Sequence, residues 1–289
     1  MTRRSVRRCT TSLALVVATM LTIGACSDSR SQPAAKPIAD VPASPVDDAA
    51  DHAADAGQGG AALARIGRDD VKYRPSEDTV ALRAGVIVGR ISTGKDVSGD
   101  SAITPTHDLQ VCKPFTDSRL PSLQRGVGNA VVWLLGVTQG PPQDASRRAT
   151  LMLERCQLSP RVQRMASGGT VLVTSGDAMM SNLRFVGVGD GAVRATVSLN
   201  DAGHVVPNSE IGTAAGLVEV RDDRHPWVRA YIAVSSHPFV AVTAPDGGFR
   251  FDGVPSGAYT LLVWQEQLGV RTKAVRVTQG VSTRVSVEY

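Results

Sequence analysis

Short apolar runs separated by turn residues recur along the chain from residue 79 to the C-terminus. They are rich in Val, Ile, Thr and aromatic residues, which favour β-strands. Turn signals such as Asp190-Gly191 and Asp252-Gly253 separate them, and no helical periodicity longer than about ten residues is visible. The runs occupy residues 79–92, 129–137, 149–158, 169–175, 216–222, 228–235, 239–244, 247–254, 258–266, 273–279 and 283–289. This pattern predicts an all-β fold built from sandwiches or Greek-key barrels.

The N-terminus carries a different pattern. Residues 13–23 (LALVVATMLTI) form an uncharged segment of 11 residues, which as a helix is too short to span a bilayer. Four arginines and no acid precede it: Arg3, Arg4, Arg7 and Arg8. The segment therefore indicates an export signal over residues 1–25. The next residues, Ile23-Gly24-Ala25-Cys26, resemble a bacterial lipobox, which implies cleavage before Cys26 and a lipid on its sulfur. The alternative is an ordinary signal peptide followed by an accidental cysteine.

The stretch after the signal is poor in core-forming residues. Residues 31–60 are rich in Ala, Pro, Asp and Gly and contain no aromatic residue. Such a segment cannot bury enough apolar surface to offset its ordering entropy, so we expect a disordered tether over residues 26–79. Ser27 after the lipidated cysteine resembles an outer-membrane sorting signal. We therefore expect a protein anchored by lipid in the cell envelope, on the periplasmic face of the outer membrane.

The net charge excludes one class of partner. The chain has 31 basic and 27 acidic residues, a formal charge of +4. Because four arginines lie in the export signal, 27 basic residues remain against 27 acidic ones. A neutral mature chain gives no argument for a nucleic-acid partner.

Two cysteines remain for the folded part. Cys9 leaves with the signal and Cys26 carries the lipid, so Cys112 and Cys156 are an even pair in an oxidising compartment. We expect a disulfide between them, and the alternative is two buried free thiols.

Motifs for catalysis are absent or incomplete. Residues 89–96 (GRISTGKD) place Asp96 where a P-loop needs a hydroxyl for Mg²⁺, and residues 187–191 share only glycines with a dinucleotide fingerprint. The chain contains no Gly-x-Ser-x-Gly elbow and no His-Glu-x-x-His sequence. We therefore expect no enzyme and no cofactor.

Residues 246–264 (DGGFRFDGVPSGAYTLLVW) resemble the carboxypeptidase regulatory-like β-sandwich, a fold also described as carbohydrate-binding-like. The likeness lies in the hairpin turn, the corner Pro255-x-Gly257-x-Tyr259 and the apolar strand that follows. It covers residues 236–289 and implies a β-sandwich there.

Residues 224–234 (RHPWVRAYIAV) and the following His237-Pro238-Phe239 resemble bacterial plastocyanin-like proteins, in which a cupredoxin domain precedes such a tail. In that family a Cys-x-x-His-Pro-Trp-Met segment supplies three copper ligands and a His-Asn dipeptide supplies the fourth. Of these, the chain retains His225. The other three positions hold Asp222 for the Cys, Val228 for the Met and Ser181 for the second His.

A blue copper site needs a thiolate and two imidazoles, so the resemblance implies a degenerate, copper-free site. We expect His225 to be a structural residue hydrogen-bonded under Trp227. Met179 and Met180 lie near the lost histidine, and we expect both to pack in the core. Gln265 replaces the histidine of a Trp-His-Glu sequence in the family, which fits the loss of metal.

These observations favour a non-catalytic binding or assembly module with a protein partner in the envelope. Candidate contacts are the segments 181–185 and 222–227, predicted as neighbouring loops. The alternative is a metal-binding or electron-transfer protein with altered ligands. A third reading is carbohydrate binding through aromatic faces, although Trp133, Trp227 and Trp264 are the tryptophans available and each is expected in the core.

The domain boundaries follow from the two resemblances. We assign residues 80–235 to a cupredoxin-like Greek-key sandwich and residues 236–289 to the carboxypeptidase regulatory-like sandwich. Fifty-four residues are few for an independent core, so strands from residues 80–140 are alternatively part of the second sandwich. In that case the middle of the chain is an insertion.

Overall fold

A computed structural model describes residues 56–70, 72–76, 84–94, 97 and 100–289. The export signal, Cys26 and the first part of the predicted tether lie outside these residues. No helix among the described residues has the length and apolar content needed to cross a bilayer.

The described residues form twenty strands and one α-helix, so the predicted all-β class is confirmed. In chain order the elements are α1 (Ala56–Asp70), β1 (Arg74–Pro75), β2 (Ala84–Ser92), β3 (Asp100–Ile103), β4 (Phe115–Ser118), β5 (Val131–Leu135), β6 (Gln139–Gly140), β7 (Arg148–Glu154), β8 (Gln157–Ser159), β9 (Val162–Ala166), β10 (Thr170–Ser175), β11 (Ser181–Gly187), β12 (Val193–Leu199), β13 (Val205–Asn208), the short 3₁₀-helix η1 (Glu210–Gly212), β14 (Gly216–Asp222), β15 (Arg229–Ser235), β16 (Val240–Val242), β17 (Gly248–Pro255), β18 (Gly257–Gln265), β19 (Gly269–Val277) and β20 (Ser282–Glu288).

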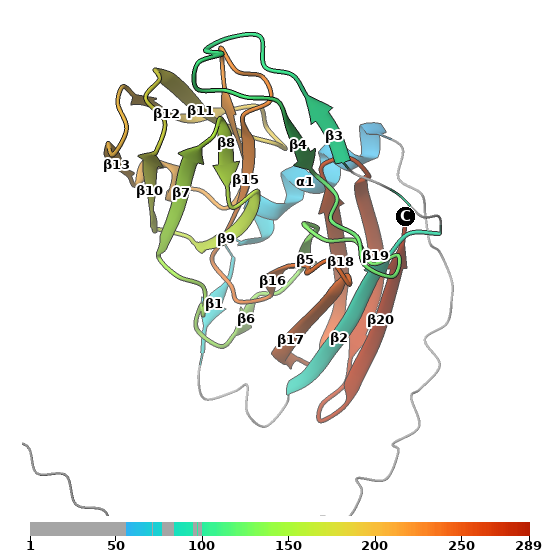
Figure 1. Ribbon diagram of the computed structural model, residues 1–289. Coiled ribbons are helices and arrows are strands. Elements are labelled where there is room, and N and C mark those ends of the chain that lie inside the picture. Colours follow the sequence, from blue (N-terminus) through green and yellow to red (C-terminus); the bar gives the residue numbers. More distant parts are fainter. Residues whose placement is uncertain (1–55, 71, 77–83, 95–96, 98–99) are drawn as a thin grey trace, which may run out of the picture. The chain divides into compact units, whose positions relative to one another are not determined.

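Two sheets enclose the core of the first sandwich. Their strand orders are β13-β10-β7-β8 and β12-β11-β14-β15-β9, and both groups are visible in Figure 1. Strand β7 shows why these residues form a sheet: every second side chain is buried and the others are exposed. Cys112 and Cys156 lie in this core and form the predicted disulfide, with their Cα atoms 5.4 Å apart. The disulfide prediction is therefore confirmed.

The second sandwich combines early and late parts of the chain. Its sheets have the orders β16-β5-β18-β19 and β17-β2-β20, so β5 and β2 are both central strands. Strands from the region 80–140 thus complete the C-terminal sandwich, as the insertion alternative describes. Residues 148–235, which contain every strand of the first sandwich, are inserted between β6 and β16.

The turn predicted before β17 is present, but the turn predicted at Asp252-Gly253 is wrong: both residues lie inside β17, where the pairing with β2 shifts register between Phe251 and Val254. Gly247 has φ +78 in the turn before β17, and a Cβ atom there would lie 1.9 Å from the carbonyl oxygen of Ile91. At the predicted corner, the hydroxyl of Tyr259 donates a hydrogen bond to the carbonyl of Pro255 at 2.8 Å.

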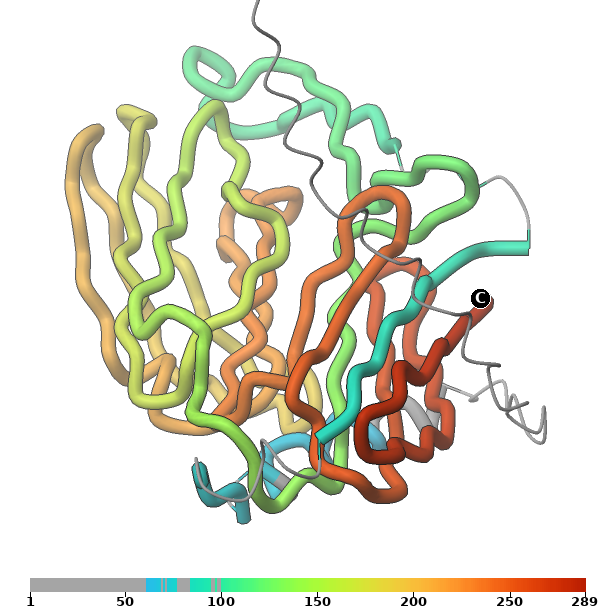
Figure 2. The backbone as a smooth tube through the Cα atoms, turned by 90° about the horizontal axis from the view of Figure 1, so that it is seen from below, coloured from blue at the N-terminus to red at the C-terminus, as the bar shows by residue number. Residues whose placement is uncertain are grey.

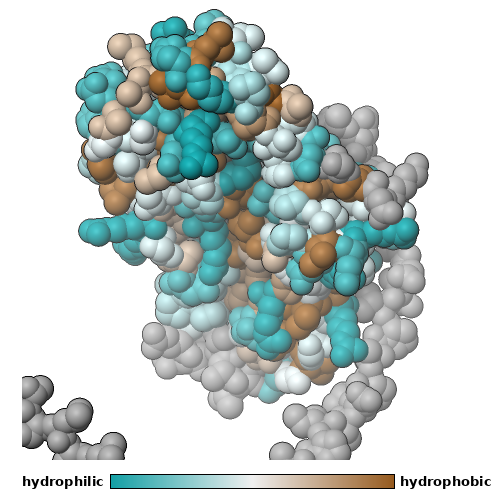
Figure 3. Space-filling model, viewed as in Figure 1, coloured by the Kyte–Doolittle hydropathy of each residue, from teal (hydrophilic) through white to brown (hydrophobic). Residues whose placement is uncertain are grey.

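A third apolar layer joins the two sandwiches. In β5, Val132 and Leu134 face the core of the second sandwich, whereas Val131, Trp133 and Leu135 face this layer, which also receives side chains from β9, β14 and β15. Both faces of β5 are buried, which explains its continuous apolar run. Figure 2 shows the two groups of strands side by side, and Figure 3 shows apolar side chains toward the middle of one face.

The prediction of a disordered tether up to residue 79 is wrong for residues 56–70, which form helix α1. Leu63 and Ile66 are buried in the third layer, and the helix contacts β5, β14 and β19 (Figure 2). Its sequence contains several glycines, so packing of its apolar face on the third layer, rather than intrinsic helix propensity, stabilises it.

The interpretation of residues 181–185 as a loop is also wrong. They belong to β11, which lies between β12 and β14. Leu183 and Phe185 are fully buried and alternate with more exposed residues, which is the pattern of a strand with one face on the core. The flanking apolar runs are short, and this hid the strand in the sequence.

Candidate functional site

The four positions that the resemblance assigns to copper ligands meet at one end of the first sandwich. Ser181 begins β11, Asp222 ends the neighbouring strand β14, and His225 and Val228 lie in the turn from β14 to β15. All four side chains are buried. The predicted closeness of the two segments is therefore confirmed, although one of them is a strand.

The Asp222 carboxylate is the centre of this site. One oxygen, Oδ2, accepts hydrogen bonds from the Ser181 hydroxyl and from the backbone N–H of Asn182, the latter at 3.0 Å. The other, Oδ1, accepts from the backbone N–H groups of Arg224 at 2.7 Å and His225 at 2.9 Å, and lies 3.0 Å from Nδ1 of the His225 ring. A buried carboxylate needs such donors because it has lost its water. Asp222 thus ties together both strands and the turn.

The ring of His225 is engaged at both nitrogens. Besides the contact of Nδ1 with Asp222, Nε2 lies 2.9 Å from Oδ2 of Asp108. The ring is completely buried and packs edge-on against Trp227, with centroids 5.5 Å apart. Neither nitrogen therefore presents a free lone pair to a ligand. The expected hydrogen bonds and packing beside Trp227 are present, and the structural role of His225 stays a prediction.

Asp108 is the site residue that the sequence reasoning missed. It lies in the segment between β3 and β4, 117 positions before His225, and Arg224 approaches the same carboxylate oxygen at 3.7 Å. The backbone N–H of Cys112 donates to the Asp108 carbonyl at 2.8 Å, so the disulfide to Cys156 holds Asp108 against the first sandwich. The predicted disulfide is the signal that could have found Asp108, because Cys112 lies four residues after it and fixes this segment to the first sandwich.

The two methionines near the site differ. Met179 is buried in the core, and its sulfur lies 3.7 Å from both sulfurs of the disulfide. This confirms the packing prediction for Met179. The same prediction is wrong for Met180, whose side chain is 56% exposed because it points outward at the entry to β11.

A second imidazole lies nearby without completing a metal site. The exposed His107 has its ring centroid 6.4 Å from that of His225, and its Nδ1 lies 3.0 Å from the Thr106 hydroxyl. Among the described residues no group of three or more His, Cys, Asp or Glu side chains is arranged to hold a metal ion. The donor set of hydroxyl, carboxylate, one engaged imidazole and Val228 does not fit a blue copper site, which requires a thiolate and free imidazole lone pairs.

The aromatic residues do not form an open platform. Trp133, Trp227 and Trp264 are all buried, as predicted. The indole N–H of Trp227 has no hydrogen-bond partner within the part of the chain that the structure describes. Gln265, at the family's histidine position, is also buried, and its Oε1 accepts from the backbone N–H of Gln267 at 2.7 Å in the turn to β19.

Charged side chains join the two sandwiches beside the third layer. Arg161, which follows β8, makes a two-pronged contact with Glu266 at 3.0 and 2.7 Å and approaches Asp117 at 3.4 Å. Burial alone would lower the pKa of Arg161, but the hydrogen bond and charge of Glu266 and the charge of Asp117 raise it overall. Burial, and next the charge of Glu266, raises the pKa of Tyr231 to about 12.

The comparisons with known proteins give short or distant matches. The model of polysaccharide lyase family 4, domain II, matches residues 208–285, which begin at the end of β13 and reach into β20. This segment crosses from the first sandwich into the second and covers less than half of the chain. No curated protein matches the chain.

Several solved structures with similarity to this chain are cupredoxins. A purple cupredoxin from Nitrosopumilus maritimus is 20% identical, with 30% of this chain and 99% of that chain covered and a TM-score of 0.26. A reduced variant of amicyanin is 19% identical over 30% and 82% of the two chains, with a TM-score of 0.27. A copper-containing nitrite reductase from Thermus scotoductus is 18% identical over 30% and 22%, also with a TM-score of 0.27. At such scores the matches carry no argument about the site.

Proposed function

We propose that the chain is a lipid-anchored envelope protein that acts as a non-catalytic binding or assembly module. In this proposal Cys26 carries the lipid, the anchor lies on the periplasmic face of the outer membrane, and the sandwiches present a surface to a protein partner. The first sandwich is a degenerate cupredoxin domain, and a hydrogen-bonded carboxylate takes the structural place of the metal.

The observation that carries the proposal is the environment of Asp222. A metal ion in such a site would draw the side chains at positions 181, 222 and 225 together by coordination. Here Ser181 and His225 both contact the Asp222 carboxylate instead. The end of the sandwich is thus closed by hydrogen bonds within the chain, which supports a structural rather than a redox role.

Equilibrium dialysis of the full chain against Cu(II), with visible absorbance, tests the loss of metal binding. The wild type should retain no stoichiometric copper and show no intense thiolate charge-transfer band. The matched variant Ser181→His/Asp222→Cys/Val228→Met restores the family's ligand types at the same positions and should gain such a band. Stoichiometric copper in the wild type would favour the alternative, a metal-binding or electron-transfer protein with altered ligands.

Detergent partitioning tests the anchor separately. The full chain expressed in bacteria should enter the detergent phase and Cys26→Ala should stay in the aqueous phase, because a diacylglycerol group supplies most of the membrane affinity. Equal partitioning of the two chains would contradict lipidation without bearing on the site.

Site-specific photo-crosslinking tests the binding role. Met180 is exposed next to Ser181, whereas Val281, 37% exposed in the turn before β20, is the control on the second sandwich. A cross-linker at Met180 should capture one recurrent envelope protein, and one at Val281 should not. Absence of any cross-linked species at Met180 would count against a partner at this end.

A further inference from the structure

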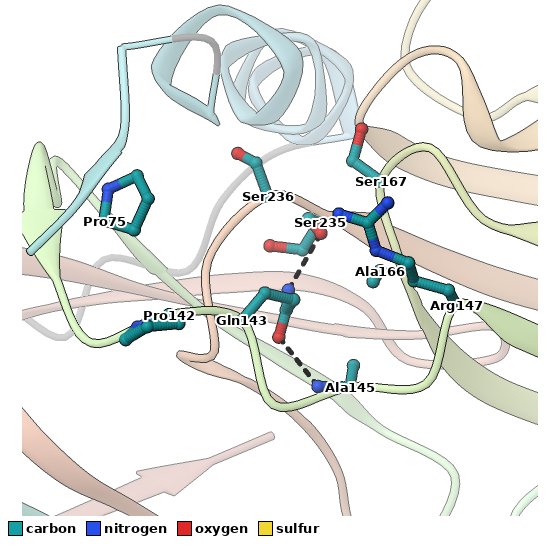
Figure 4. Close-up of a pocket in the computed structure, with 9 residues that line it drawn as sticks. All are labelled: Pro75, Pro142, Gln143, Ala145, Arg147, Ala166, Ser167, Ser235 and Ser236. Atoms are coloured by element: carbon teal, nitrogen blue, oxygen red, sulfur yellow. Dashed lines mark hydrogen bonds between the residues drawn. The ribbon is translucent and has the colours of Figure 1, made fainter.

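A cavity of about 330 Å³ lies where the chain passes between the two sandwiches. Its walls come from the connection between β6 and β7, the ends of β9 and β15, and β1. The lining residues are Pro75, Pro142, Gln143, Ala145, Arg147, Ala166, Ser167, Ser235 and Ser236 (Figure 4). Cavities of this size at the junction of two folded bodies are common ligand sites. This one is separate from the Asp222 centre and does not depend on the function proposed above.

Hydrogen bonds hold the walls in place. The Gln143 side-chain amide donates to the carbonyls of Ser235 at 2.8 Å and His237 at 2.7 Å, and its oxygen accepts from the N–H of Ala145 at 3.0 Å. Figure 4 shows this amide bridging the two connecting segments. The cavity is therefore preformed rather than dependent on a mobile loop.

A buried acid that contacts the lining residue Ser236 is already satisfied. Asp70, at the end of α1, is 1% exposed. Its carboxylate accepts hydrogen bonds from the N–H of Ser236 at 2.7 Å and from the indole of Trp133 at 3.3 Å, and lies 3.1 Å from Nε2 of His237. Because these neighbours occupy the carboxylate, it is not available to pair with a cation in the cavity.

Arg147 supplies the charge of the cavity. It is the one charged residue among those that line the cavity. Its side chain is exposed to solvent, as that of Arg148 is, and no partner for its guanidinium is found in the described ranges. By contrast, the nearby Arg164 pairs with Asp144 at 2.9 Å. Figure 4 shows the Arg147 guanidinium directed toward Ser235 and Ser167, across from Pro75 and Pro142. The Ser167 hydroxyl has only a long contact of 3.4 Å with the carbonyl of Gly212.

We propose that this cavity binds a small organic carboxylate. The planar guanidinium of Arg147 matches a carboxylate with two parallel hydrogen bonds. The apolar part of the ligand lies against Pro75 and Pro142. An inorganic anion such as phosphate uses the charge but gains nothing from these apolar walls, so it should bind more weakly.

Isothermal titration of the full chain in detergent with acetate, butyrate, benzoate and inorganic phosphate tests the proposal. Butyrate and benzoate should bind saturably and more tightly than acetate or phosphate. Arg147→Gln should weaken binding by at least about tenfold, since it removes a charge-assisted contact. The control is Arg148→Gln, because Arg148 is exposed on β7 and does not line the cavity. This variant should bind as the wild type does.

Three results would overturn the proposal. One is the absence of saturable binding by any of the organic carboxylates. Another is equal affinity of wild type and Arg147→Gln. The third is tighter binding of phosphate than of every carboxylate. As a control for folding, both variants should unfold at the same midpoint temperature as the wild type. A loss of binding is then due to the changed side chain and not to unfolding.

Discussion

Replacing Asp222 by Asn probes the carboxylate centre with little change in shape. The amide oxygen can take the place of Oδ1, with its donors from Arg224 and His225. The amide NH₂ then faces the backbone N–H of Asn182, which loses its acceptor. A buried donor without a partner costs about 1–3 kcal/mol, and the remaining hydrogen bonds lose their charge assistance, about 1–2 kcal/mol in all.

The expected destabilisation by Asp222→Asn is therefore about 2–5 kcal/mol. For a folded region of roughly 150–250 residues, each kcal/mol lost from the free energy of unfolding lowers Tm by roughly 2–4 °C. Thermal unfolding followed by circular dichroism should show a decrease of about 10 °C.

Asp223→Asn is the matched control. Asp223 is the next residue, but its side chain is 50% exposed and its ion pair with Arg184 lies at the surface. Such pairs contribute at most about 1 kcal/mol, so Tm should change little. Equal Tm values for the two variants would refute the argument that Asp222 organises this end of the sandwich.

Three further measurements test other parts of the structure. Reducing the disulfide between Cys112 and Cys156 opens a loop with a sequence separation of 44. The chain-entropy model gives a loss of about 4 kcal/mol in the free energy of unfolding, so the urea midpoint should fall on reduction. An unchanged midpoint contradicts this expectation. Burial raises the pKa of Tyr231 from 10.0 to about 12. The stability that its neutral phenol contributes is therefore complete below pH 10 and is lost as the pH rises through 12. Tyr231→Phe should flatten the alkaline part of the curve of stability against pH, and a curve as steep as that of the wild type counts against this. Arg161→Met leaves the carboxylate of Glu266 buried without its partner and should lower the free energy of unfolding by about 3–5 kcal/mol. The double variant Arg161→Met/Glu266→Met should recover much of this loss. A double variant no more stable than the single one would be contrary evidence.

The parts of the fold that the sequence predicted are those with a local pattern. The last residues of β19 and strand β20 alternate apolar and polar residues, and both are recognisable in the sequence because one face is buried. Strands β5 and β15 read as continuous apolar runs because a second apolar layer covers their other face. The sequence could not show which sheets they join, since both faces look alike.

The missed elements depend on distant contacts. Among the side chains of helix α1 that the structure describes, Leu63 and Ile66 are the buried hydrophobic ones of the third layer, and the glycines around them give the segment the composition of a linker. Asp108 has no motif around it, and its partner His225 is 117 positions away. By contrast, the positions of Ser181, Asp222 and His225 followed from spacing in a family resemblance, which already encodes the tertiary arrangement.

Under the proposed function, Asp222 stands where a copper protein has its thiolate, and this determines what a metal site at this end of the sandwich would need. A thiolate and a carboxylate each bring one negative charge to this point, but the carboxylate accepts hydrogen bonds from the Ser181 hydroxyl and from the backbone of the turn. Asp222→Cys alone would remove those acceptors and would still leave a hydroxyl at position 181 and an aliphatic side chain at position 228, where a blue copper site has an imidazole and a thioether. Asp108 would also remain on Nε2 of His225. We therefore expect Asp222→Cys to lose stability without gaining the thiolate charge-transfer band, because copper binding requires all the ligand positions to change together.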